Sequence, residues 1–417
     1  MKKTLVPFVI LLLAALACSL PVPGATITPV SPDDRITEPP PTSPPDPDPA
    51  PPDPEPVPAV LTVVYARAGN ITLWHEGSAP QPLTSTGLDN FPRISDDGQM
   101  IAFLRDNELY AIRADGSDER LLVSLEYLNS FQPADALNVE IHSFDFRTNS
   151  HEIFFDLVGD FDAFWIPVND LHRVDAQTGE TGLLLASGSG GEWTFSPDGQ
   201  RFALAQAEAI RIFNHDGSGG QEVLNFPFVS TYSEWVYYPQ VVWVNDSSGF
   251  YTVIPASQSL DNPTETSKYY FISLAEGSAL LTEFISAPLN FPHISPNGLQ
   301  VAYVSEVPGA QHLLIYDAVE DTTYFIAGSE YLSIMNWNPD SQRLAFQADD
   351  PLNPVLQASD GTGDPVLLSD TRRFFIMRWV SESRFLFLND EELRIRELPG
   401  ASVLIDSSVS AYDFVLP

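Results

Sequence analysis

From Val60 to the C-terminus, apolar stretches of strand length alternate with short polar turns. One unit recurs: an apolar strand ends at a turn similar to Ser-Pro-Asp-Gly, and a second apolar strand follows directly. The turns stand roughly 43 to 52 residues apart and begin at Ser95, Arg147, Ser196, Asp246, Ser295, Asn338 and Val380. A repeat of this length with four short strands is typical of a β-propeller blade. The pattern therefore predicts an all-β propeller.

Two positions keep their character from copy to copy. The fourth residue after the turn is alanine in four copies within otherwise bulky strands, and the set is Ala102, Phe154, Ala203, Val253, Ala302, Ala345 and Phe387. The residue before the turn is large and apolar in the set Ile94, Phe146, Phe195, Ile294, Trp337 and Trp379. A small residue at a fixed strand position suits packing near a tapered centre. We expect the large residues to form the core between sheets.

The best copy of the turn carries a family resemblance. Ser196-Pro197-Asp198-Gly199, followed by a strand containing Ala203, resembles the repeat of TolB-type, WD-repeat-like β-propellers, and the copy from Ser295 to Ala302 is the next most similar. The resemblance covers residues 59–417. It implies the fold but little about function, because that family includes scaffolds, regulatory domains of peptidases and glycan-active enzymes.

The two ends of the repeat region predict the number of blades. The first strands, Leu61–Ala66, Ile71–Glu76 and Gln81–Thr84, lack a preceding inner strand, whereas the last strand, Ala411–Pro417, has no successor. Joining them would close the ring with a blade of three strands plus one and remove the exposed sheet edges. Seven turn-bearing repeats and this composite give eight blades. Seven blades are the alternative if the irregular segment Asn138–Ser187 is an insertion.

The N-terminus has the pattern of an export signal. Lys2 and Lys3 precede an almost purely apolar run from Thr4 to Ala17, and the only cysteine of the chain, Cys18, follows directly. An apolar run of this length that ends in small residues is typical of a secretory signal. Its end resembles the lipobox of bacterial lipoproteins, although Ala15 stands where that family more often has leucine. The resemblance implies that residues 1–17 are removed and that Cys18 carries acyl chains; the alternative is an ordinary signal peptide.

Residues 18–58 are expected to form a stalk that begins with the lipidated cysteine. Sixteen of the forty residues from Ser19 to Pro58 are proline, and aspartates alternate with prolines towards the end of this stretch. Such a segment buries little apolar surface and stays outside a packed core. We expect it to be disordered and to lift the propeller, residues 59–417, from a membrane. The protein would then be an extracytoplasmic, membrane-anchored lipoprotein of a bacterial cell envelope.

Charge and residue types exclude several functions. The chain has 56 acidic and 20 basic side chains, a formal net charge of −36, so it lacks the clustered cations that nucleic acid binding requires. A single cysteine excludes an intrachain disulfide framework. The seven histidines are scattered, but His142, His293 and His312 are a candidate metal set, because oligogalacturonate lyases of this family use histidines. We expect these three to be unrelated, with no metal, no cofactor and no catalytic residues.

Aromatic residues in a long connection are the best candidates for binding. Three connections are long, Ser124–Val139, Phe226–Pro239 and Ala256–Ser267, and propeller topology predicts them on one face. The second contains the predicted binding residues Phe228, Tyr232, Trp235, Tyr237 and Tyr238. Exposed aromatic side chains on loops of a rigid scaffold commonly build recognition surfaces. The alternative is that these rings fold back over the sheet as a local core.

The leading hypothesis is a monomeric, non-enzymatic scaffold that binds an envelope protein, a peptide or a glycan. The alternative is a polysaccharide lyase or hydrolase with its site over the propeller channel. An enzyme would gather titratable side chains at the mouth of the channel, whereas a scaffold would present aromatic and polar groups without them.

Overall fold

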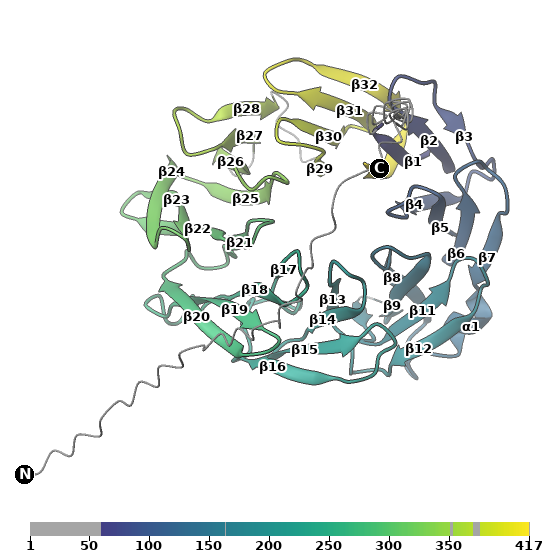
Figure 1. Cartoon of the computed structure of the whole chain (residues 1–417), viewed down its shortest axis with the longest axis horizontal. Coiled ribbons are helices and arrows are strands. Elements are labelled where there is room, and N and C mark those ends of the chain that lie inside the picture. The colour runs from purple at the N-terminus through teal and green to yellow at the C-terminus, as the bar shows by residue number, and fades with distance from the viewer. Residues whose placement is uncertain (1–59, 163, 351–352, 370–375, 417) are drawn as a thin grey trace, which may run out of the picture. The chain divides into compact units, whose positions relative to one another are not determined.

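The computed structural model describes residues 60–416 except 163, 351–352 and 370–375. The predicted signal 1–17, Cys18 and the stalk 18–58 lie outside the described residues. Eight antiparallel sheets follow one another around a central axis (Figure 1). The α-helix found in the described ranges is α1 (Leu125–Asn129), and no described helix is long and apolar enough to cross a membrane.

The strands of each blade follow one another from the axis outwards. The first blade has β4 (Asp89–Ile94), β5 (Met100–Arg105), β6 (Glu108–Arg113) and β7 (Arg120–Val123). The second has β8 (Asn138–Phe146), β9 (Glu152–Asp160), β11 (Leu171–Asp175) and β12 (Thr181–Leu185), with β10 (Trp165–Pro167) as a further strand on β9. The third has β13 (Glu192–Phe195), β14 (Arg201–Ala205), β15 (Ala209–Asn214) and β16 (Gln221–Asn225). The fourth has β17 (Val241–Trp243), β18 (Gly249–Ile254), β19 (Ser267–Ser273) and β20 (Gly277–Phe284).

The remaining blades complete the ring. The fifth has β21 (His293–Ile294), β22 (Gln300–Val307), β23 (Ala310–Asp317) and β24 (Thr322–Ser329). The sixth has β25 (Leu332–Trp337), β26 (Leu344–Asp350), β27 (Asn353–Ser359) and β28 (Val366–Ser369). The seventh has β29 (Ile376–Trp379), β30 (Arg384–Asn389), β31 (Glu392–Glu397) and β32 (Ser402–Ser407). The eighth has β33 (Val409–Val415), β1 (Thr62–Arg67), β2 (Asn70–His75) and β3 (Gln81–Pro82).

The eighth blade confirms the predicted closure of the ring. The C-terminal strand β33 pairs with β1, and the register places Val64 opposite Asp413 and Tyr65 opposite Tyr412. The segment 138–187, which the seven-blade alternative treated as an insertion, forms the second blade. The alternative count is therefore wrong, because this irregular segment still supplies four strands in blade order.

The Ser-Pro-Asp-Gly turn is held by its own side chains. Ser196 Oγ donates to Asp198 Oδ1 at 2.6 Å, and the same carboxylate oxygen accepts the Gln200 backbone N–H at 3.0 Å. Gly199 has φ +64, and a Cβ at this position would lie 2.5 Å from the Thr148 carbonyl oxygen of the preceding blade. Glycine is therefore required both for the backbone conformation and for the close approach of two blades.

The predicted small residues lie at the blade centres. Ala102, Ala203, Ala302 and Ala345 are fully buried, in agreement with the prediction. The predicted register was wrong in the fourth blade. There the Ser247 N–H donates to the Val244 carbonyl, and Ser247 has φ +60. The turn therefore closes two residues earlier than the sequence predicted. The equivalent residue there is Tyr251 instead of Val253, and in the seventh blade the shorter turn makes it Leu386 instead of Phe387.

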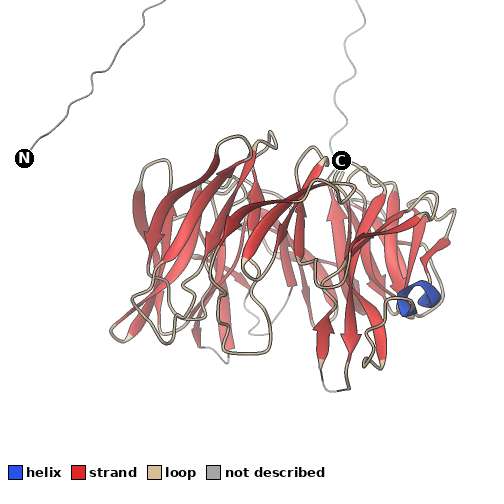
Figure 2. Cartoon of the chain, turned by 90° about the horizontal axis from the view of Figure 1, so that it is seen from below, coloured by secondary structure: helices blue, strands red, loops and turns tan. Residues whose placement is uncertain are grey.

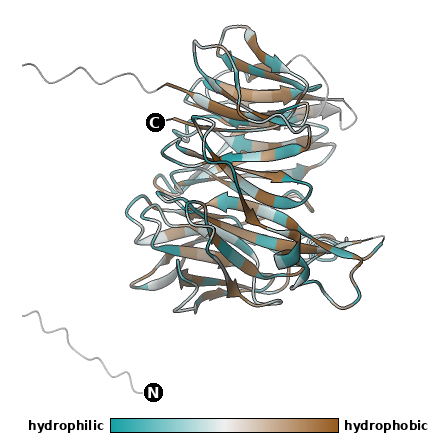
Figure 3. Ribbon diagram, turned by 90° about the vertical axis from the view of Figure 1, so that its right-hand side faces the viewer, coloured by the Kyte–Doolittle hydropathy of each residue, from teal (hydrophilic) through white to brown (hydrophobic). Residues whose placement is uncertain are grey.

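The large residues before the turns pack between neighbouring blades, as predicted. Trp337 is buried, and its Nε1 donates to the His293 carbonyl of the preceding blade at 3.3 Å. Trp243 occupies the same position in the fourth blade and donates to the Thr194 carbonyl at 3.0 Å. Figure 3 shows hydrophobic and hydrophilic positions along the strands of the blades.

Two faces of the disc carry different connections. The turns after each innermost strand lie on one face, the turn face, because consecutive strands are antiparallel. The connections between the second and third strands and those between blades lie on the opposite face, the loop face. The C-terminal end of the propeller is on the turn face and α1 lies towards the loop face (Figure 2). All three long connections that the sequence contains belong to the loop face, as predicted.

Candidate functional site

The loop between β16 and β17 alternates between buried and exposed side chains. Phe226 and Tyr237 belong to the core formed with the third and fourth blades and are 6% and 8% exposed. Between these anchors, Phe228, Tyr232 and Trp235 are 47%, 41% and 51% exposed. The loop thus presents three aromatic rings while its two ends are fixed in the core.

Contacts with neighbouring loops hold this segment in place. The Ser230 N–H donates to the Ser257 carbonyl at 2.8 Å, and Tyr232 Oη donates to Asp261 Oδ2 at 3.0 Å, so the loop is joined to the connection between β18 and β19. One edge of Trp235 faces the Phe291 ring, with 5.5 Å between centroids. A loop bound at several points loses little further conformational entropy when a partner binds.

The predicted binding residues therefore divide into three groups. Phe228, Tyr232 and Trp235 are exposed and stay candidates. The prediction that Tyr237 lies on the surface is wrong. Its ring stacks on that of Phe291, with 4.6 Å between centroids, and burial raises the pKa of its hydroxyl, so Tyr237 is part of the core. Tyr238 is half-buried and donates to Asn169 Oδ1 of the second blade at 3.1 Å.

A second exposed apolar group on the loop face was missed by sequence reasoning. Phe164, Trp165 and Ile166 lie on the β9–β10 hairpin and are 51%, 54% and 50% exposed. Strand β10 continues the connection between the second and third strands of its blade, which places it on the loop face. The available signal was a run of three consecutive large apolar residues, which neither strand alternation nor turn chemistry explains.

A polar cluster joins the second and third blades on the loop-face side of the inner strands. His142 Nδ1 on β8 lies 3.1 Å from Asp156 Oδ2 on β9, and Asp156 Oδ1 accepts the Ser143 N–H at 2.9 Å. Glu192 begins the inner strand β13. Burial, followed by the charges of Glu192 and Asp156, raises the pKa of the Tyr238 hydroxyl. Within the described residues, the side chain of Glu192 has no hydrogen-bond or ion-pair partner, although its backbone pairs with Ala205.

The hydrogen bonds and charges of this cluster shift the pKa of two of its groups. The hydrogen bond to Asp156 raises the pKa of His142 against the opposing effect of burial. Glu192 is exposed, but desolvation by the protein atoms around its carboxyl group, and then the charge of Asp156, raise its pKa. The imidazole is therefore stabilised in its charged form, whereas Glu192 is a carboxyl group with free acceptor oxygens and an increased tendency to hold a proton.

The three histidines of the candidate metal set do not gather. His142 contacts Asp156 in the second blade. His312 lies on β23 of the fifth blade, edge-on to Phe325 with 5.1 Å between ring centroids. His293 lies on the innermost strand of the fifth blade. Burial lowers the pKa of His293 to about 4. Across the described parts of the chain, no group of three His, Cys, Asp or Glu side chains is placed to hold a metal ion.

The inner strands also bring eight residues to one level around the axis, and we name this set the central ring. Each precedes the large core residue of its blade, and pairing with the second strand gives the common level: Arg93, Asp145, Thr194, Val242, His293, Asn336, Arg378 and Asp413. Asp145, Thr194 and Arg378 are exposed, so solvent reaches the centre at this level. Charged residues occupy four consecutive blades, from the seventh to the second.

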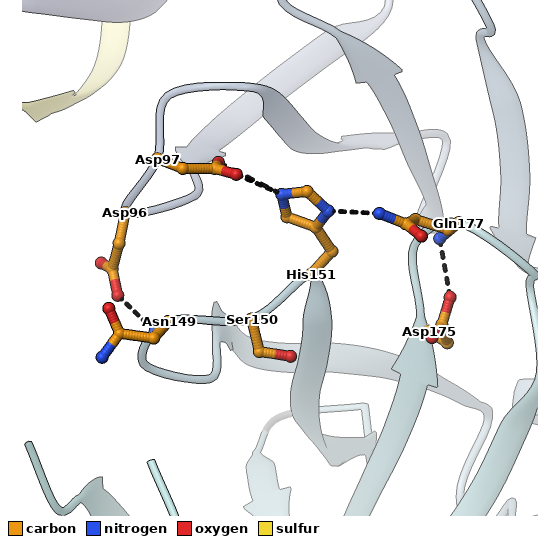
Figure 4. A pocket seen from close by; sticks show the side chains of 7 residues that line it. All are labelled: Asp96, Asp97, Asn149, Ser150, His151, Asp175 and Gln177. Carbon is orange, nitrogen blue, oxygen red and sulfur yellow. Dashed lines mark hydrogen bonds and ion pairs between the residues drawn. The ribbon is translucent and has the colours of Figure 1, made fainter. Parts of the chain in front are cut away.

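The turn face contains a cavity of about 490 Å³ between the first and second blades (Figure 4). Its carboxylates are already engaged across the junction: Asp96 Oδ2 accepts the Asn149 N–H at 2.7 Å, and His151 Nε2 lies 2.9 Å from Asp97 Oδ2. Burial acts to raise the pKa of Asp97, but hydrogen bonds from Ser95, the Gln99 N–H and His151 bring it below its ordinary value. These groups join two blades, and we assign the cavity a structural role.

Comparisons with known proteins concern the fold alone. No protein family and no curated protein matches the sequence. A crystal structure of a eukaryotic initiation factor is similar over 85% of each chain, with 11% identity and a TM-score of 0.53. An oligogalacturonate lyase in complex with manganese covers 71% of this chain and 81% of its own, with 14% identity and a TM-score of 0.44. TolB from Acinetobacter baumannii covers 76% and 65%, with 14% identity and a TM-score of 0.37.

The class that follows is an eight-bladed β-propeller protein. Sequence identities of this size establish the architecture alone. The function has to be argued from the loop face and the central ring.

Proposed function

We propose that this propeller is a lipid-anchored extracytoplasmic scaffold that binds a protein, peptide or glycan through its loop face. The observation that carries the proposal is the exposure of Phe228, Tyr232 and Trp235 on a loop whose ends are buried. Aromatic side chains are enriched at recognition surfaces because each brings a large rigid contact area with few rotatable bonds.

The rest of the loop face supports the same function. Phe164, Trp165 and Ile166 form a second apolar group, and the polar cluster of His142, Asp156 and Glu192 belongs to the same face. Binding surfaces of proteins typically combine apolar contact areas with hydrogen-bonding groups. Each exposed ring leaves apolar area in contact with solvent that a partner would cover.

The position of the chain ends supports an outward orientation of this face. Thr62 pairs with Val415 at the turn face, so the polypeptide that precedes Val60 joins the propeller there. A tether on the turn face leaves the loop face directed away from the membrane. We propose that the anchor is the acylated Cys18, because two or three acyl chains hold a protein stably on a bilayer.

The anchor is tested by replacing the cysteine. Cys18→Ala should move the protein from the membrane fraction to the soluble extracytoplasmic fraction, and Ser19→Ala should leave its distribution unchanged. If Cys18→Ala protein stays with the membrane fraction, lipid attachment at Cys18 is refuted.

The binding face is tested with the full-length protein immobilised and exposed to an envelope extract. Trp235→Ala should lose most of the material retained by the wild type and keep its melting temperature, because the indole is half exposed. Phe325→Ala is the matched control, since Phe325 is 55% exposed on β24, an outermost strand of the fifth blade. Equal retention by both variants and the wild type would contradict the proposal.

An enzyme acting on a polysaccharide is the second candidate, and the polar cluster is the observation that favours it. Glu192, whose pKa is raised, lies near the His142–Asp156 pair, and a carboxyl group beside an imidazole is a suitable arrangement for general acid–base chemistry. Incubation with acidic and neutral polysaccharides, followed by reducing-end and unsaturated-product assays, tests this candidate. Turnover that Glu192→Gln abolishes would support the enzyme, whereas no turnover on any polymer would support the scaffold.

A further inference from the structure

The charged arc of the central ring alternates in sign. Arg378, Asp413, Arg93 and Asp145 come from the seventh, eighth, first and second blades in that order. Each charge of the arc therefore has at least one neighbour of opposite sign in the ring. The contacts show that only one half of the arc is paired.

Asp413 is satisfied by two donors. Its Oδ1 accepts a hydrogen bond from Arg378 Nη1, and its Oδ2 accepts the Ile94 backbone N–H at 3.0 Å. The residue is 6% exposed, so this carboxylate is part of the closure of the ring. Arg378 also stacks over Phe414, with 4.8 Å from its guanidinium carbon to the ring centroid.

Arg93 is positioned in a similar way but lacks an acid partner. Its guanidinium carbon lies 5.8 Å from the Phe144 centroid of the next blade, and Nη1 donates to the Pro92 carbonyl at 3.1 Å. Among the described residues, no carboxylate lies within 4.0 Å of it. A guanidinium has five N–H donors, and within the described parts of the chain the remaining donors of this half-buried group have no protein acceptor.

The surrounding charges restrict what such a group would bind. Guanidinium groups bind carboxylates and phosphates through paired N–H donors. Asp145 and Asp413 stand on either side of Arg93 in the ring, and their charges would repel a doubly charged phosphate more strongly than a singly charged carboxylate. We propose that Arg93 binds a carboxylate at the centre of the propeller, supplied either by a small organic acid or by a peptide C-terminus.

Asp145 controls the strength of this site. Its Oδ1 accepts the Phe146 N–H at 2.8 Å, and its second oxygen has no partner among the described residues. Solvent reaches Asp145, but the protein atoms packed around its carboxylate remove part of its hydration. This desolvation, followed by the charge of Asp413, raises the pKa of Asp145 to about 6, with Arg93 and Arg378 acting in the opposite direction. A bound carboxylate would face the Asp145 charge directly, so removing that charge should strengthen binding.

The test uses the full-length protein and two probes that differ in one charge. N-Acetylglycine and N-acetylglycinamide are titrated by ligand-observed NMR, with propionate as a third probe. The wild type should bind N-acetylglycine at least tenfold more tightly than the amide. Arg93→Gln should remove this difference, Arg93→Lys should keep part of it, and Asp145→Asn should tighten acid binding severalfold.

Arg201→Gln is the control, because Arg201 is an exposed arginine on β14 away from the ring, and it should bind as the wild type does. Tighter binding of N-acetylglycine than of propionate assigns the site to a peptide C-terminus, and equal binding assigns it to a small acid. The proposal is overturned if neither acid binds at 50 mM, if acid and amide bind equally, or if a normally folded Arg93→Gln protein binds as the wild type. It does not depend on the proposed function of the loop face.

Discussion

Removal of the Asp413 carboxylate is the most informative perturbation of the closed ring. Asp413 lies on β33, the strand that joins the two ends of the chain, and it connects Arg378 of the seventh blade with the Ile94 N–H of the first. Its side chain is 9% exposed, whereas that of Arg378 is 45% exposed. Asp413→Ala therefore leaves one buried N–H unsatisfied and returns one guanidinium largely to solvent.

The expected change in the free energy of unfolding follows from these two losses. Breaking a buried ion pair from one side costs about 3 to 5 kcal/mol, and the exposure of Arg378 reduces this contribution because its charge is rehydrated. An unsatisfied backbone N–H costs about 1 to 3 kcal/mol. We expect Asp413→Ala to lower the free energy of unfolding by about 3 kcal/mol. Asp413→Asn keeps an acceptor for Ile94 and should cost roughly half as much.

Urea denaturation followed by tryptophan fluorescence measures both variants at one pH. Glu276→Ala removes one exposed carboxylate from the turn between β19 and β20 and should change the midpoint little. The reasoning fails if the free energy of unfolding of Asp413→Ala lies within about 0.5 kcal/mol of that of the wild type, which is the usual range for surface substitutions. It also fails if the alanine and asparagine variants are equally destabilised.

Three further predictions concern the core, the ring and the turns. Tyr237→Ala should lower the free energy of unfolding by about 3 kcal/mol, whereas Trp235→Ala should change it by less than about 1 kcal/mol in the same urea experiment. Asp145→Asn should raise the urea midpoint at pH 7.5 and raise it less at pH 4.5. The pKa of Asp145 is raised from 3.8 to about 6, so ionisation opposes folding, and stability is lost as the pH rises from the first value to the second. Contact with solvent limits the gain to about 1 kcal/mol. Gly199→Ala should lower the thermal midpoint by several degrees, because a Cβ would lie 2.5 Å from the Thr148 carbonyl at φ +64.

The architecture was predictable because its signals are local and repeated. The Ser-Pro-Asp-Gly turn has a local sequence signal, because Ser196 and Asp198 bind within it and Gly199 has a positive φ, and the spacing of such turns gives the blade length. Closure by the two ends followed from counting strands. The predicted register was wrong at Ser247. This residue has a positive φ without being glycine, so the sequence gives no glycine signal for the turn that forms there.

The candidate site was only partly predictable, because burial within a loop depends on distant residues. Trp235 and Tyr237 are two positions apart in the same loop, and Phe291 from the next inter-blade connection contacts both of them. The stacked Tyr237 is buried, whereas Trp235 meets Phe291 only along an edge. The central ring was not predicted at all, since Arg93 and Asp413 become neighbours only when the circle closes.

The claim that the loop face is the recognition surface is tested most directly by hydrogen–deuterium exchange. The full-length protein is measured alone and after saturation with the envelope material that it retains. The account predicts new protection in residues 226–239 and 160–167, with the turns at 95–98 and 147–151 unchanged. Protection confined to those turns, with residues 226–239 exchanging as in the free protein, would contradict it.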